Sequence, residues 1–279
     1  MNFSINTNVG AQIALESLSL TNAQLSATQK QISTGFRVAD ATDDGAAYAV
    51  AQRVRSDVGA LTSANQQLGY AQGLLDATNT GLQKASDDLN SLKGTLEQLA
   101  SGTIQGNQRT QYQTTYTSLV AQIKNDLNGA SYNGQTLIGN IGSTPSGVTF
   151  ARIAVVQDQL ATTYGLATFS ANTFYNSINV NSFTSTHAQS FLTGTFANAL
   201  NSLADQLNNY GVAKNYVTAQ ISYNSDKIDA LNTGIGALVD ANLAQESAQL
   251  QALQVRQQLG TQALSLANQT PASLLSLFK

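Results

Sequence analysis

Few side chains in this sequence could do chemistry, and the first candidates are acidic. The stretch Asp40-Ala41-Thr42-Asp43-Asp44-Gly45 has the spacing of a calcium-binding loop, with a glycine at the sixth position. The twelfth position is Ala51, however, and not the bidentate glutamate that such a loop requires. The stretch therefore predicts an acidic start and cap for a following helix, and no calcium site.

Two further stretches could suggest catalysis or cofactor binding. The single histidine, His187, lies beside Ser185 and Thr186, but a serine and a histidine with a remote aspartate are too common by chance, so an ordinary loop histidine is favoured. Gly139-Asn140-Ile141-Gly142 lacks the following Lys-Ser/Thr of a nucleotide loop. The sequence has no cysteine, which excludes thiol chemistry. We therefore predict no enzyme and no catalytic, cofactor-binding or metal-binding residues.

The composition of the chain argues against several kinds of binding partner. Only 10% of the 279 residues are charged, against about 25% in an ordinary soluble domain. A net charge of -3 without a basic cluster argues against nucleic acid. No stretch approaches the roughly 18 apolar residues of a membrane span, and the first thirty residues do not have the features of a secretory signal. Neutral polar residues or association must therefore cover the surface.

Apolar residues spaced alternately by three and four predict two long helices. The first set is Leu61, Ala64, Leu68, Ala71, Leu75, Thr78, Leu82, Ala85, Leu89, Leu92, Leu96 and Leu99. The second is Phe196, Leu200, Leu203, Leu207, Tyr210, Lys214, Val217, Ile221, Asn224, Ile228, Leu231, Ile235 and Leu238. Such narrow stripes are typical of coiled coils, in which polar positions such as Lys214 and Asn224 fix the register.

The two ends of the chain carry weaker stripes. Near the start the stripe is Ala11, Ala14, Leu18, Thr21, Leu25, Thr28 and Ile32. Near the end there are two, namely Leu243, Leu250, Leu253 and Leu264, and Leu238, Ala241, Ala248, Ala252, Val255, Leu259 and Leu266. Two stripes on one helix need two neighbours. The N-terminal helix can be one neighbour, and another copy of the chain is the most economical second.

Between the two long helices the spacing of the apolar residues changes. A third helix is predicted from about 108 to 130, followed by a turn at Tyr132-Asn133-Gly134-Gln135. Residues 131–187 then favour short strands and loops. The predicted fold is mainly α: a long antiparallel coiled-coil or helical bundle formed by the N- and C-terminal halves, with a small β/loop tip.

The termini resemble bacterial flagellin. The N-terminal match is carried by Ile5-Asn6-Thr7-Asn8, Gln31-Ile32-Ser33-Thr34-Gly35-Phe36-Arg37 and Ala39-Asp40-Ala41-Thr42-Asp43-Asp44-Gly45-Ala46-Ala47. The C-terminal match is carried by residues 238–248, 250–260 and the closing Ser273-Leu274-Leu275-Ser276-Leu277-Phe278-Lys279. Together they cover roughly 1–140 and 188–279, with no room for the large outer domains of many flagellins.

The resemblance implies an extracellular subunit that self-assembles as a helical homopolymer into the flagellar filament, for swimming motility. It implies export by the flagellar type III apparatus, and as partners hook–junction and cap proteins and an export chaperone, with no nucleic acid, membrane or cofactor. Its implied division is 1–40 with 240–279 as one inner-core domain, 41–140 and 188–239 as the long-helix bundle, and 141–187 as a variable tip. A hook–filament junction protein and a surface adhesin remain alternatives.

Three sets of residues follow from this interpretation. Self-assembly is expected to rest on Leu18, Leu25, Ile32, Leu250, Leu253, Leu264, Leu274, Leu275, Leu277 and Phe278. Candidate O-glycosylation sites, which the resemblance implies for the tip, are Ser143, Thr144, Ser146, Thr168, Ser170, Thr173, Ser182, Thr184 and Ser185. Many flagellins carry Leu-Gln-Arg-Val-Arg-Glu-Leu for the animal innate receptor; here Ser91 and Gly94 replace an arginine and the glutamate, which predicts weak or no engagement.

Overall fold

The computed structural model describes residues 7–142 and 149–276, with side chains as far as residue 269. The chain divides into two compact units. Unit 1 comprises residues 1–56 and 230–279, and unit 2 comprises residues 57–229. Two long helices, α2 (Gly45–Ala100) and α6 (Thr195–Val239), contribute to both units.

Unit 2 is built on the predicted leucine stripe of α2. All twelve stripe positions from Leu61 to Leu99 are fully or almost fully buried, including the polar Thr78, whose hydroxyl donates to the Leu74 carbonyl. On α6 the stripe residues Phe196, Leu203, Tyr210 and Val217 are buried against the same core. The three-and-four spacing therefore identified the buried faces of both helices, and this prediction is confirmed.

Polar residues in the α6 stripe pair with α2, as register-fixing residues do. Asn224 is fully buried, and its Nδ2 donates to Asn65 Oδ1 and to the Gln157 carbonyl, both at 2.9 Å. Lys214 forms an ion pair with Asp76 at 2.5 Å. Since 224 pairs with 65 and 214 with 76, the two helices run antiparallel.

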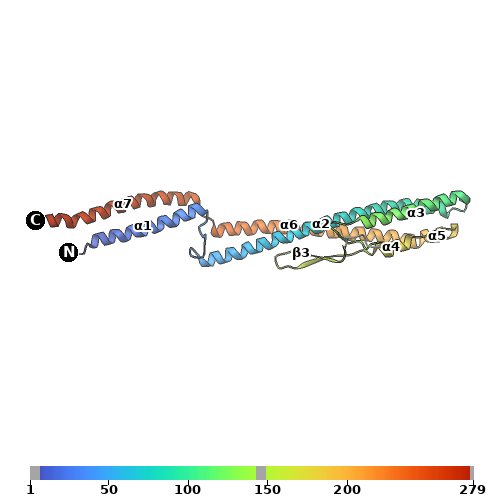
Figure 1. The fold of residues 1–279 in the computed structure, drawn as a ribbon, viewed down its shortest axis with the longest axis horizontal. Coiled ribbons are helices and arrows are strands. Elements are labelled where there is room, and N and C mark those ends of the chain that lie inside the picture. The colour runs from blue at the N-terminus through green and yellow to red at the C-terminus, as the bar shows by residue number, and fades with distance from the viewer. Residues whose placement is uncertain (1–6, 143–148, 277–279) are drawn as a thin grey trace. The chain divides into compact units, whose positions relative to one another are not determined.

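The third helix, α3 (Gly106–Gly129), lies alongside the last part of α2 and buries Tyr116, Val120, Ile123 and Leu127 in the core of unit 2 (Figure 1). The predicted turn follows it. Asn133 and Gly134 both have positive φ, and Tyr132 and Gln135 exchange backbone hydrogen bonds of 2.9 and 3.0 Å. Positive φ at both central residues is the signature of a tight hairpin turn, so the Asn-Gly pair gave the right prediction.

The tip contains two small sheets. Strands β1 (Gln135–Thr136) and β2 (Thr149–Phe150) pair in parallel, and β3 (Ile153–Val156) and β4 (Thr163–Leu166) pair antiparallel with Val155 opposite Tyr164. Strands and loops do not continue to residue 187, however. Two short helices follow, α4 (Ala171–Ile178) and α5 (Ser185–Thr193).

Both short helices bury apolar residues at helical spacing, which the abundance of Asn, Ser and Thr concealed. In α4 the buried residues are Ala171, Phe174 and Ile178, and in α5 they are Ala188 and Phe191. The Thr184 side chain caps α5 by accepting from the backbone of His187. His187 therefore lies in the first turn of a helix, and the prediction of a loop histidine is wrong.

Unit 1 pairs the two terminal helices, α1 (Val9–Thr34) and α7 (Leu243–Ser276), which lie side by side (Figure 1). The Asn8 side chain caps α1 by accepting from Ala11 N at 3.1 Å. Gly35 ends the helix with φ 75°, a left-handed conformation that favours glycine. Where α2 begins, Asp44 Oδ1 accepts from the backbones of Ala46 and Ala47, which confirms the predicted acidic cap.

Candidate assembly surface

The α1–α7 pair is held in one antiparallel register by side-chain hydrogen bonds at one of its ends and near the middle of both helices. Asn8 Nδ2 donates to the Ala267 carbonyl at 2.7 Å, and Gln257 Nε2 donates to Asn22 Oδ1 at 2.7 Å. Between these bonds, a Cβ placed on Gly260 would lie 3.2 Å from Leu18 Cδ1. The pair is therefore closely packed at this point, and a side chain larger than hydrogen would force Leu18 to move.

The faces that meet follow the stripes read from the sequence. On α1 every stripe residue from Ala11 to Ile32 is half-buried or buried, and Thr28 is the most completely buried. On α7 the covered positions are Glu246, Leu250, Leu253, Gln257, Gly260, Leu264 and Ala267, spaced by three and four. Leu253 is only 2% exposed, whereas Leu243, at the start of this helix, is exposed.

Six of the residues predicted to carry assembly lie in this α1–α7 seam. They are Leu18, Leu25, Ile32, Leu250, Leu253 and Leu264. Leu274 and Leu275 fall within α7, but their side chains lie outside the described residues, as do Leu277 and Phe278 altogether. The described leucines therefore contact the other terminal helix of the same chain.

A second apolar stripe on α7 has no cover within the described part of the chain. Val255, Leu259 and Leu266 are 55%, 58% and 66% exposed. On α1 the large side chains Val9, Ile13, Leu15 and Leu20 are exposed as well. Isolated exposed leucines are ordinary, but a run of them along both helices of a pair marks an interaction surface.

The junction between the end of α1 and the segment that links α6 to α7 was not predicted. Phe36 and Asp240 form an isolated antiparallel bridge, with Arg37 N donating to the Val239 carbonyl at 2.7 Å and Ala241 N to the Gly35 carbonyl at 2.9 Å. Beneath the bridge, Val38, Ala47, Ala51 and Val239 form a small buried cluster. Its members come from three separate segments, so no periodic pattern relates them.

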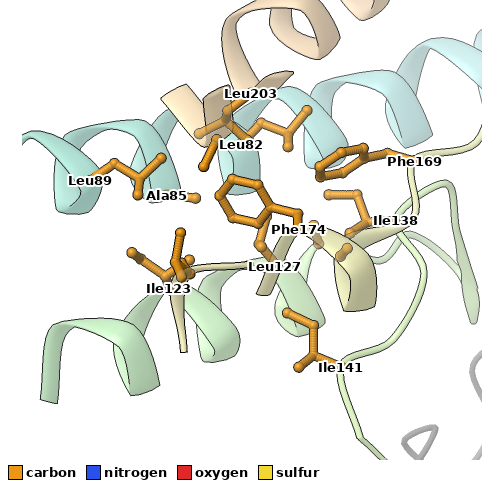
Figure 2. Close-up of a cluster of buried hydrophobic side chains, with 14 of the residues drawn as sticks. Leu82, Ala85, Leu89, Ile123, Leu127, Ile138, Ile141, Phe169, Phe174 and Leu203 are labelled. Atoms are coloured by element: carbon orange, nitrogen blue, oxygen red, sulfur yellow. The ribbon is translucent and has the colours of Figure 1, made fainter. Parts of the chain in front are cut away.

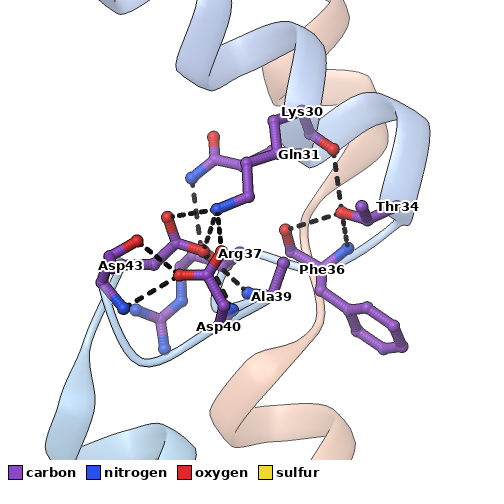
Figure 3. Close-up of polar contacts among 9 residues, drawn as sticks. Lys30, Gln31, Thr34, Phe36, Arg37, Ala39, Asp40 and Asp43 are labelled. Atoms are coloured by element: carbon purple, nitrogen blue, oxygen red, sulfur yellow. Dashed lines mark hydrogen bonds and ion pairs between the residues drawn. The ribbon is translucent and has the colours of Figure 1, made fainter.

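An ion-pair clasp closes the loop that leaves α1 (Figure 3). Lys30 Nζ donates to Asp40 Oδ2 at 2.7 Å and to Asp43 Oδ1 at 2.8 Å. Asp43 Oδ2 also accepts from the backbones of Ala39 and Asp40. Hydrogen bonding to Lys30 holds the pKa of both carboxyls below the ordinary aspartate value of 3.8. The acidic stretch that resembles a calcium loop thus binds a lysine of its own chain.

This clasp predicts acid sensitivity of the loop. A carboxyl whose pKa is depressed by folding stabilises the fold above its unfolded pKa and ceases to do so as the pH falls through its folded pKa. We expect the Asp40 and Asp43 carboxyl carbons to titrate below pH 3.8 in nuclear magnetic resonance, and to move upward in Lys30→Met. Lys93→Met, at an exposed lysine of α2, is the control. Equal titration in all three proteins would contradict the clasp.

The candidate glycosylation sites that the structure describes are accessible. Thr168, Ser170, Thr173, Ser182 and Thr184 are exposed, and Ser185 is partly exposed. Ser143, Thr144 and Ser146 lie outside the described residues.

Among residues 7–142 and 149–276 no three histidine, cysteine or acidic side chains come together as metal ligands. No described helix combines the length and the apolar character that crossing a membrane requires.

Comparison with known proteins gives matches to both ends of the chain. The family model for the bacterial flagellin N-terminal helical region matches residues 5–143, and that for the bacterial flagellin C-terminal helical region matches residues 193–278.

Individual relatives match along almost the whole length. Flagellin FljM of Caulobacter vibrioides is 32% identical over 281 residues, which is 99% of this chain and 98% of that protein. A flagellin of Brucella melitensis is 34% identical over 283 residues, 99% of each chain. The crystal structure of Bacillus cereus flagellin matches with a TM-score of 0.51 and 17% identity, over 57% of this chain and 88% of that one. This last likeness concerns the fold alone.

Proposed function

This chain belongs to the bacterial flagellin family, and from that premise we propose how its residues build a filament. The family is structural, and the protein is a self-assembling subunit of the extracellular flagellar filament. It is exported by the flagellar type III apparatus, and the filament serves swimming motility. We assign assembly to the terminal helices, in line with the proposed division into 1–40 with 240–279, 41–140, 141–187 and 188–239.

In this proposal the two stripes of α7 have different tasks. Leu18, Leu25, Ile32, Leu250, Leu253 and Leu264 hold α1 and α7 together, so that the pair is presented as one unit. Val255, Leu259 and Leu266 then meet neighbouring copies, and Leu274, Leu275, Leu277 and Phe278 extend the assembly region. The observation that carries the proposal is the exposed second stripe beside an already covered one. Covering an apolar side chain contributes about 1.5–3 kcal/mol, repeated in every subunit.

The proposal can be tested by introducing a charge into the exposed second stripe of α7. We expect Leu259→Asp to prevent polymerisation on filament seeds, because the carboxylate would have to be buried against a neighbouring copy without a partner. The α1–α7 pair is expected to persist, since Leu259 lies outside its seam. Electron microscopy scores the filaments. Asn90→Asp, on an exposed position of α2, is expected to polymerise. Normal filaments from Leu259→Asp would overturn the proposed role of the stripe.

We infer further that the chain performs no catalysis and that its other partners are those of filament growth: hook–junction and cap proteins and an export chaperone. The support for the first inference is the position of the candidate residues. His187 contacts Phe183 and Phe191 with its ring, and the acidic stretch at Asp40 and Asp43 is occupied by Lys30.

We also propose weak or no engagement of the animal innate flagellin receptor. In the stretch from Leu89 to Thr95 the two leucines and Thr95 are buried, so a receptor would meet the exposed residues Asn90, Ser91, Lys93 and Gly94. A serine and a glycine cannot replace the charge of an arginine and a glutamate. We expect little signal in a receptor-reporter assay in which a potent flagellin is the positive control. Equal potency would contradict the proposal.

The tip hydroxyls are proposed as O-glycosylation sites. The support is the exposure of Thr168, Ser170, Thr173, Ser182 and Thr184. The intact mass of native filament protein tests this, because each attached sugar adds a defined mass. A mass equal to that of the bare chain would exclude the modification.

A further inference from the structure

Helices α2 and α3 approach each other unusually closely in unit 2. A Cβ placed on Gly81 would lie 2.6 Å from Ala130 Cβ and 3.0 Å from the Asp126 carbonyl oxygen. Beside this contact Ala85 and Leu89 of α2 face Ile123 and Leu127 of α3 in the buried core (Figure 2). Close packing therefore sets the separation of the two helices. The helices cannot move apart freely to relieve repulsion between side chains that meet across them.

Two aspartates meet across this interface. Asp88 of α2 and Asp126 of α3 are both partly buried and interact through their carboxyl groups. Asp88 Oδ2 is shielded from solvent and receives no hydrogen bond from any described residue. An ionised carboxylate can only accept hydrogen bonds, so two ionised carboxylates repel and cannot bond to each other. A proton on one of them supplies the missing donor.

The charged groups around the pair do not remove this repulsion. Asp126 faces Asp88 from α3, and Asp87 adds a second negative charge from α2. Lys84, also on α2, opposes them, but more weakly than the other causes. On α6 the nearby cation Lys214 is already paired with Asp76. Burial, followed by the interaction with Asp126, raises the pKa of Asp88 above its usual range.

We propose that Asp88 and Asp126 share one proton and form a pH-responsive latch between α2 and α3. One carboxyl takes a proton from the solvent, and its hydroxyl then donates to the carboxylate of the other. When both groups are ionised, the close contact at Gly81 holds two negative charges together and the pairing of the helices weakens. The inference concerns the isolated chain as well as the filament, and it stands apart from the assembly roles proposed above.

The sign of the effect is opposite to that of the Lys30 clasp. A carboxyl whose folded pKa is raised costs no stability below its unfolded pKa and costs progressively more as the pH rises through its folded pKa. The α2–α3 pairing therefore strengthens as the pH falls toward the ordinary aspartate value of 3.8, whereas the clasp of unit 1 opens only below that value. Because the filament is extracellular, this latch meets the pH of the surrounding medium directly.

The experiment combines two measurements on the full chain. Carboxyl-carbon nuclear magnetic resonance follows the titration of Asp88 and Asp126, whose apparent pKa values belong to the pair. Hydrogen exchange, corrected for the intrinsic effect of pH, follows the amides of α3. We expect the protection of these amides to rise as the pH is lowered from 7 toward 4, by about tenfold for each unit by which folding raises the pKa of the pair.

Variants separate the latch from a general effect of charge. In Asp88→Asn the amide donates to Asp126 at every pH, so we expect α3 to be better protected at pH 7 than in the wild type and its pH dependence to disappear. Asp126→Asn is expected to behave in the same way. Glu97→Gln, at an exposed position of the same helix, is expected to keep the wild-type pH dependence. A titration of both carboxyls below pH 4, or the same pH dependence in Asp88→Asn as in the wild type, would overturn the proposal.

Discussion

Leu253→Asp is expected to abolish filament formation and to leave unit 2 folded. Leu253 is 2% exposed in the α1–α7 seam, and its burial contributes about 1.5–3 kcal/mol. The substitution removes this contribution and also puts an unpaired carboxylate into an apolar seam, which costs further free energy. Among the described residues the seam is formed by these two helices alone, so few other contacts can compensate. Unit 2 has its own core from Leu68 to Val217 and does not depend on this residue.

Electron microscopy of seeded protein and circular dichroism of the unpolymerised chain measure the two halves of this prediction. The control is Gln251→Asp, which adds the same charge to α7 at an exposed position. We expect it to polymerise. If Gln251→Asp failed in the same way, the added charge itself and not the loss of the seam would explain the result. Filaments from Leu253→Asp would show that the α1–α7 pairing is dispensable.

The long helices could be predicted because the pattern that specifies them is local in the sequence and is repeated at every turn. The stripe from Leu61 to Leu99 repeats the same three-and-four spacing over many turns. A helix that buried any other face would therefore expose leucines along its whole length. The same repetition revealed that α7 carries two stripes, of which the described structure covers one and leaves the one containing Val255, Leu259 and Leu266 exposed. Asn224 was recognisable for a related reason, because a single polar residue inside a regular apolar stripe is conspicuous.

The contacts between segments could not be predicted in the same way. Lys30 contacts Asp40 and Asp43 because the chain reverses its direction at Gly35. The spacing of these residues in the sequence does not predict that reversal. Asp88 and Asp126 meet because α2 and α3 pack antiparallel in one particular register. A shift of a single helical turn would place other residues opposite each other. Such pairs depend on tertiary geometry, whereas the stripes depend on secondary structure alone.

The Gly81 contact predicts opposite effects of the same substitution at two glycines of α2. At Gly94 a Cβ would meet no atom within 4 Å, so Gly94→Ala is expected to stabilise the chain by up to about 1 kcal/mol through helix propensity. At Gly81 the Cβ would meet Ala130 Cβ at 2.6 Å and the backbone oxygen of Asp126 at 3.0 Å. Neither atom can move without its helix. Overpacking of this kind costs about 1–3 kcal/mol, which exceeds the gain in propensity.

Chemical denaturation of the two variants gives the decisive comparison, since both replace a glycine by alanine within one helix. We expect the midpoint to fall for Gly81→Ala and to rise for Gly94→Ala. The difference also bears on the latch, because pushing α3 away from Gly81 separates Asp88 from Asp126 and should reduce the pH dependence of α3 protection. If Gly81→Ala were as stable as Gly94→Ala, α3 would have room to move. The close approach would then not be what forces the two carboxyl groups together.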